Sequence, residues 1–277
     1  MTLLARNNCF KAGIILAAFS LCLIAIGGYV SFQVFPEVSA SAAQRSRGVL
    51  QILVKNHAEP SAYMPFWTML GAALYSLVSI ILIFYFFEKT QSPEILFIAL
   101  FVISLTFEFA RITIPLNRLF SFPLIYLTAA SRVLLFGRYF GVLSLFAASV
   151  YAAGLDAQKQ QNIFLMLVLA ALVISLNIPI DSMVWDSTLT LQSGYGSMFS
   201  MVELGLLVIT MFTFIVSAYT RGSRNYIFIG IGTLLIFAGR NILLHSDTWI
   251  TPIPGLIILA VGTWYVCSRL HLEYLWL

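Results

Sequence analysis

Charge is what this sequence has least of. Of its 277 residues, 15 are Lys or Arg and 11 are Asp or Glu, so that 9% of the chain is charged and 60% is hydrophobic. A soluble globular domain is about 25% charged. So few charges could not cover the water-exposed surface of a protein of this length, and the composition therefore excludes a soluble fold.

Cysteine is scarce as well, and the usual chemical motifs are missing from the sequence. Cys9, Cys22 and Cys267 are far apart and lack CxxC or CxxH spacing, so neither a zinc site nor a disulfide is indicated. The phosphate-binding patterns GxGxxG and GxxxxGKS/T do not occur. We therefore predict no cofactor, no metal and no catalytic residue set, and an enzyme is not the favoured class.

The small excess of basic residues has an ordinary explanation in a membrane protein. The formal net charge is +4, which in a soluble protein could hint at nucleic-acid binding. Here Lys and Arg stand near the ends of apolar segments, where they set the orientation of a chain in the membrane. The predicted surroundings are therefore a lipid bilayer, without nucleic acid.

Apolar runs of about twenty residues recur along the chain, which is the length that crosses a hydrocarbon core of about 30 Å as a helix. The runs are continuously apolar and do not alternate as the strands of a barrel would. They predict an all-α, polytopic integral membrane bundle of about eight transmembrane helices, with a tight turn at residues 116–119. The expected spans are 12–35, 65–87, 95–114, 122–155, 163–180, 198–219, 226–244 and 252–270.

The chain reads as a single membrane domain over residues 1–277. Cleavage at the small-residue stretch 39–43 is an alternative to a retained first helix. Apolar residues at helical spacing within 49–55 predict a short amphipathic helix at the membrane surface. The expected parts are a signal-anchor helix at 12–35, a short external segment at 36–64, a seven-helix bundle at 65–270 and a short cytoplasmic tail at 271–277.

The run 122–155 is too long for one straight span, and it could be one long helix or two segments broken at Gly137. As one helix, it places eight basic residues on the side of the N-terminus and only four opposite, whereas two segments abolish this bias. We therefore favour eight helices with both termini in the cytoplasm (N-in/C-in), in a bacterial inner membrane. The eight residues are Arg6, Lys11, Lys89, Arg138, Lys159, Arg221, Arg224 and Arg269.

Five ionisable residues inside the spans are the candidate site. A charge within the bilayer is costly, so each should face the bundle interior, a watery cavity or an interface. Counted from the turns, all five lie in the middle to outer part of the membrane, and the first two share a helix face at i, i+3. They are Glu108, Arg111, Arg132, Glu203 and Arg240.

Three arginines against two glutamates leave one positive charge uncompensated. A water-filled pocket that is open to the outside and holds a small anionic ligand would accommodate it. The alternative is that these residues form structural ion pairs or reach the headgroups. In the loop after the fifth span, Asp181 and Asp186 are interpreted as solvated charges, with a cation site as the alternative.

Several function classes fit this layout. We favour a membrane sensor or ligand-binding module that signals to a separate membrane or cytoplasmic partner protein. The alternatives are a small-solute or ion transporter, an intramembrane enzyme and a membrane subunit of a larger complex. For the seventh span, Gly230, Gly232 and Gly239 predict a closely packed neighbour.

Overall fold

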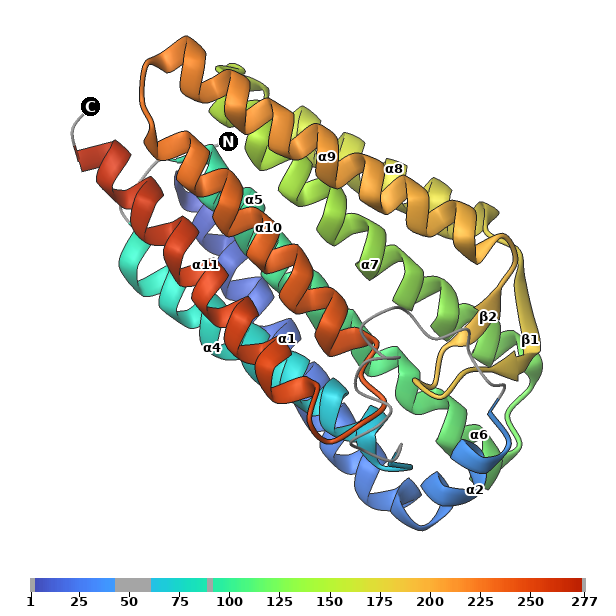
Figure 1. Ribbon diagram of the computed structural model, residues 1–277. Helices are drawn as coiled ribbons and strands as arrows, with labels where there is room; N and C mark the ends of the chain where they lie inside the picture. The colour runs from blue at the N-terminus through green and yellow to red at the C-terminus, as the bar shows by residue number, and fades with distance from the viewer. Residues whose placement is uncertain (1–2, 43–60, 89–91, 276–277) are drawn as a thin grey trace.

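The computed structural model describes residues 3–42, 61–88 and 92–275. Within them, eight helical segments are long and apolar enough to cross a membrane. This confirms the predicted all-α bundle of a multi-pass membrane protein. Both termini lie at the same end of the bundle, here called the terminal end, while the opposite end, where two short strands lie, is called the hairpin end (Figure 1).

The first four spans include the longest helices. They are α1 (Leu3–Ser31), which continues through η1 (Phe32–Val34) into α2 (Phe35–Ala40); α4 (Met64–Phe87); the joined α5 (Pro93–Ser104), η2 (Leu105–Ile112) and α6 (Thr113–Phe120); and α7 (Leu124–Ala152).

The last four spans follow a 3-10 turn and enclose a hairpin. They are η3 (Ala157–Lys159) with α8 (Gln160–Asn177); α9 (Gly196–Arg221); α10 (Asn225–Leu244); and α11 (Pro252–Leu275). Between α8 and α9, the strands β1 (Ile180–Trp185) and β2 (Leu191–Ser193) pair in antiparallel orientation.

Several helices are longer than the apolar runs that predicted them. The first begins at Leu3 instead of residue 12, and the last continues to Leu275, through most of the predicted tail. The predicted turn at 116–119 is wrong, because the helix continues through it. The helix ends where Ser121 adopts a left-handed conformation (φ 48°) and Pro123 follows, a combination that stops a helix.

The long fourth segment is one continuous helix, α7, as we favoured over two spans. Gly137 does not break it. A Cβ atom at Gly137 would lie 2.4 Å from the Cβ of Phe107, so this glycine allows α7 to lie close to η2. The predicted amphipathic helix at 49–55 lies outside the described residues.

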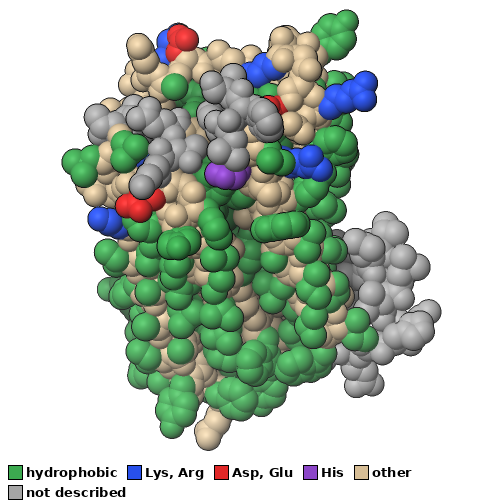
Figure 2. All heavy atoms as spheres, turned by 90° about the vertical axis from the view of Figure 1, so that its left-hand side faces the viewer, with side chains coloured by type: hydrophobic (Ala, Val, Ile, Leu, Met, Phe, Trp, Pro, Cys, Tyr) green, Lys and Arg blue, Asp and Glu red, His purple; other side chains and the backbone are tan. Residues whose placement is uncertain are grey.

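The third span, Pro93–Phe120, is the centre of the molecule. Of its most apolar stretch, 89% is buried, and every residue of α5 is buried, as expected for a helix that is apolar on all sides. The spans of α8 and α9 are peripheral, with 22% and 11% of the corresponding stretch buried. Figure 2 shows a wall of hydrophobic side chains below a charged upper part, which fits a lipid-facing surface.

Glycines hold α10 and α11 together. A Cβ at Gly239 would lie 2.6 Å from the backbone nitrogen of Leu259, and one at Gly262 would lie 3.0 Å from that of Ile236. The two helices therefore touch backbone to backbone, as small residues allow in membranes. This confirms the prediction of a close neighbour for Gly232 and Gly239; it holds for Gly230 as well, whose neighbour is Phe214 of α9.

We expect Gly239→Ala to destabilise the protein by about 1–3 kcal/mol, because the new methyl group meets backbone that cannot rotate away. The matched control is Gly205→Ala on α9, where an added Cβ meets nothing within 4 Å. That change should be neutral or stabilising by up to about 1 kcal/mol, since alanine is the better helix former. Thermal unfolding of the purified protein in detergent measures both, and equal effects would refute the glycine contact.

Candidate functional site

The carboxylate of Glu108 binds two arginines in the middle of the bundle. Arg138 of α7 donates from Nε to Oε1 (2.8 Å) and from Nη2 to Oε2 (3.1 Å), while Arg111 donates from Nη1 to Oε2 (3.2 Å). Glu108 and Arg111 are buried. A two-pronged arginine–carboxylate contact is among the strongest polar contacts available to a protein.

The arginine of α7 that lies next to Glu108 is Arg138, and not Arg132 as predicted from the sequence. Counting from the apolar boundary put Arg132 near mid-membrane and Arg138 at the terminal end, but α7 runs from Leu124 to Ala152 and Arg138 is its central residue. Arg132 instead donates to the carbonyl groups of Ser175 and Ile178. Since the last carbonyls of a helix have no partner within it, Arg132 caps the end of α8.

The other two predicted residues form the second half of the cluster. Arg240 of α10 is buried, and its Nη1 lies 3.6 Å from Oε2 of Glu203 on α9. Its Nη2 donates to the backbone carbonyl of Arg138 (3.0 Å). Four of the five predicted residues therefore come together. With Arg138 they are called here the ion-pair network: Glu108, Arg111, Arg138, Glu203 and Arg240.

The hairpin between α8 and α9 closes the network on one side. Arg111 donates from Nε (2.8 Å) and from Nη2 to the carbonyl oxygen of Thr188 in the turn between β1 and β2. Thr188 and the following Leu189 are fully buried, and Leu189 joins the hydrophobic cluster of the hairpin end. The hairpin was not predicted from the sequence, where this segment looks like a loop, because strands of six and three residues give little pattern.

Asp186 shapes the hairpin turn and lies near the network. Its Oδ1 accepts hydrogen bonds from the backbone nitrogens of Thr188 and Thr190, both at 3.0 Å. It also interacts electrostatically with Arg111 and Arg138. The network itself holds three arginines against two carboxylates, the same balance as in the set chosen from the sequence. Asp186 adds a negative charge near two of these arginines.

Along the third span, Glu108 and Arg111 lie between two hydrophobic clusters. Residues up to Leu105 belong to the main core, and Ile112 and Ile114 belong to the cluster of the hairpin end. This placement shields Glu108 and Arg111 from water and strengthens their attraction. Direct ligand binding by the five residues chosen from the sequence stays a prediction.

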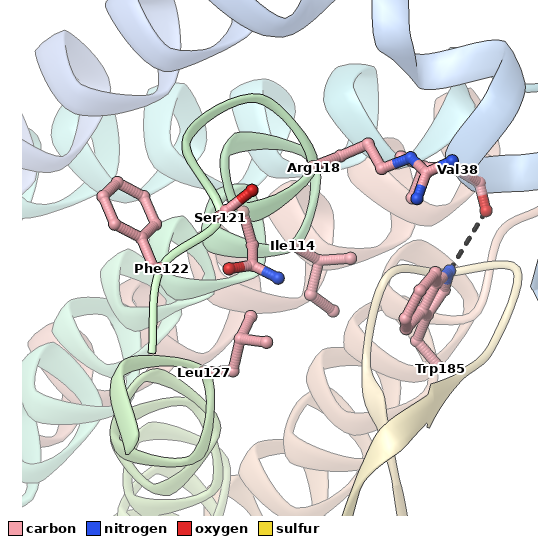
Figure 3. Close-up of a pocket in the computed structure, with 8 residues that line it drawn as sticks. Val38, Ile114, Arg118, Ser121, Phe122, Leu127 and Trp185 are labelled. Carbon is pink, nitrogen blue, oxygen red and sulfur yellow. Dashed lines mark hydrogen bonds between the residues drawn. The ribbon is translucent and has the colours of Figure 1, made fainter. Parts of the chain in front are cut away.

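A cavity of about 300 Å³ opens at the hairpin end, beyond the network. Its wall comes from α2, α6, α7 and β1, and in Figure 3 Phe122 lies across the cavity from Trp185. Trp185 is held by a hydrogen bond from Nε1 to the carbonyl of Val38 (3.0 Å). The lining residues are Val38, Ile114, Asn117, Arg118, Ser121, Phe122, Leu127 and Trp185.

Among the residues that the structure describes, no group of three or more His, Cys, Asp or Glu side chains is placed to hold a metal ion. Comparison with known proteins gives no match: no family model fits the chain, and no curated protein or solved structure is significantly similar to it. The geometry of the network and of the cavity is therefore the basis for a functional proposal.

A double-mutant cycle tests the partner of Glu108. Removing one member of a buried ion pair typically costs about 3–5 kcal/mol, so Glu108→Gln and Arg138→Gln should each destabilise strongly. The pair should show a coupling of roughly 1–3 kcal/mol, measured by thermal or denaturant unfolding in detergent. The control cycle of Glu108→Gln with Arg132→Gln should give less than about 0.5 kcal/mol. A larger coupling energy in the control cycle than in the cycle of Glu108 with Arg138 would refute the assignment of Arg138 as the partner.

Proposed function

We propose that this protein is a membrane sensing module in which the hairpin receives the input and the ion-pair network passes it to the helices. The proposal is supported above all by the contact between Arg111 and the carbonyl of Thr188. Through this contact, a movement of the hairpin changes the partners of a charge that lies deep in the bundle.

The contacts continue from the hairpin to the helices one after another. Arg111 shares Glu108 with Arg138, whose backbone carbonyl accepts from Arg240, and Arg240 pairs with Glu203. The chain of polar contacts joins the central span with α7, α10 and α9. Since each partner is needed to neutralise a charge in a dry interior, losing one contact forces the others to rearrange.

The proposed orientation of the protein in the membrane follows from the distribution of its basic residues. Arg118 lies at the hairpin end. A larger group of basic residues, among those that the structure describes, lies at the terminal end: Arg6, Lys11, Lys159, Arg221, Arg224 and Arg269. Excess Lys and Arg mark the cytoplasmic side. The hairpin then faces the outside of a bacterial inner membrane, and a separate partner protein reads the terminal end.

Hydrogen–deuterium exchange tests the coupling between the two ends. A bulky maleimide is attached to Gln192→Cys, an exposed position on β2, in a chain whose three native cysteines are serines. We expect the label to change exchange in the turns 153–159 and 220–225 at the terminal end. The additional change Arg111→Gln should abolish this effect, because it cuts the network from the hairpin.

The matched control carries the same label at Ile250→Cys, an exposed position at the hairpin end in the loop between α10 and α11, outside the hairpin itself. It should leave the turns at the terminal end unchanged. If the labelled protein is correctly folded and hydrogen–deuterium exchange at its terminal end is unchanged by the hairpin label, the sensing proposal is refuted. Solute flux through proteoliposomes that is lost in Glu108→Gln would replace it with the transporter alternative.

A further inference from the structure

The cavity at the hairpin end combines an apolar floor with a polar rim. Val38, Ile114 and Leu127 on the floor are buried, whereas Arg118 and Ser121 on the rim are exposed. Ligand sites typically have this composition, mostly apolar with a few placed polar groups, and the volume of about 300 Å³ suits a small molecule.

Arg118 supplies a cation without a carboxylate partner among the residues that the structure describes. In Figure 3 its side chain reaches from α6 toward Val38 of α2. A guanidinium in this position suits a carboxylate or phosphate group, which it binds with two parallel hydrogen bonds.

Two other lining residues favour a cation close to that anion. The Oδ1 atom of Asn117 is buried and accepts no hydrogen bond from any residue that the structure describes, and an unsatisfied buried acceptor is unfavourable. The indole ring of Trp185 forms part of the wall, and aromatic faces attract ammonium groups. An ammonium group that donates to Asn117 would satisfy that acceptor and lie beside the ring.

We propose that this cavity binds a zwitterionic group, an anionic phosphate or carboxylate with an ammonium group next to it. The anion binds Arg118, the ammonium group lies between Asn117 and Trp185, and apolar parts of the ligand cover Ile114 and Leu127. The binding site stands independently of the proposed function, but its role as the input of the sensor rests on it, through the position of Trp185 on β1.

Exposed aromatic side chains stand beside the cavity at the hairpin end. Phe120, Phe122 and Tyr126 form an exposed aromatic group beside it, with ring centroids 5.7 Å and 6.2 Å apart. Of these, Tyr126 is of the type that is enriched at the level of the headgroups. The same chemistry therefore belongs to a phosphatidylethanolamine headgroup in the membrane or to a free zwitterion outside it.

Binding is tested on the full-length protein with two probes. Soluble O-phosphoethanolamine is titrated in detergent by thermal shift, and phosphatidylethanolamine retention is measured by native mass spectrometry against phosphatidylglycerol, which lacks the ammonium group. We expect stabilisation or selective retention in the wild type. Arg118→Gln should weaken binding about tenfold or more, the effect of losing a charged hydrogen bond.

The control is Arg224→Gln, which removes the same charge from an exposed site at the terminal end and should bind like the wild type. A response to the soluble probe identifies a free ligand, and a response to the lipid alone identifies a headgroup. No response to either probe, or equal weakening by both variants, overturns the site. If a probe binds but leaves hydrogen–deuterium exchange at the terminal end unchanged, the binding site is confirmed and its role in sensing is refuted.

Discussion

The carboxylate of Glu108 is shared by two guanidinium groups, and the arrangement of the bundle depends on how those charges are satisfied. A charge buried in a membrane helix is unfavourable by about 2.5–3.5 kcal/mol at the helix centre, so no helix that carries one is stable facing lipid. Glu108 draws α7 against the central span through Arg138, and Arg111 draws the hairpin into the end of the bundle. Arg240 and Glu203 extend the same constraint to α10 and α9.

The position of the network between two hydrophobic clusters gives these contacts their strength. Water is kept from Glu108 and Arg111 on both sides along the third span. In such surroundings an ion pair attracts more strongly than at a surface, and a missing partner is correspondingly more harmful. This is why we propose the network as a connection between elements: a missing partner at the hairpin leaves a charge uncompensated next to the other helices.

The two ends of the protein carry different kinds of surface. The hairpin end combines a cavity, a cationic rim and an aromatic group, and the cavity is formed by segments that meet only in the folded chain. The terminal end gathers basic side chains, among them Arg6, which caps α4 through the carbonyls of Phe87 and Glu88. An input at one surface and a partner at the other is the division of roles that the proposed function requires.

The sequence by itself determined the membrane fold, the number of spans and four of the five network residues, because hydrophobicity and the cost of buried charge act locally along the chain. It could have pointed to Arg138, which stands at the centre of the long run 122–155, but the apolar boundaries were a poor guide to depth. Only the tertiary structure decided that Glu108 pairs with Arg138, that Arg132 caps α8 and that the hairpin turn at Thr188 meets Arg111. Pairing depends on how helices rotate and slide against one another, and that is set by contacts such as those of Gly137 and Gly239, between residues far apart in the chain.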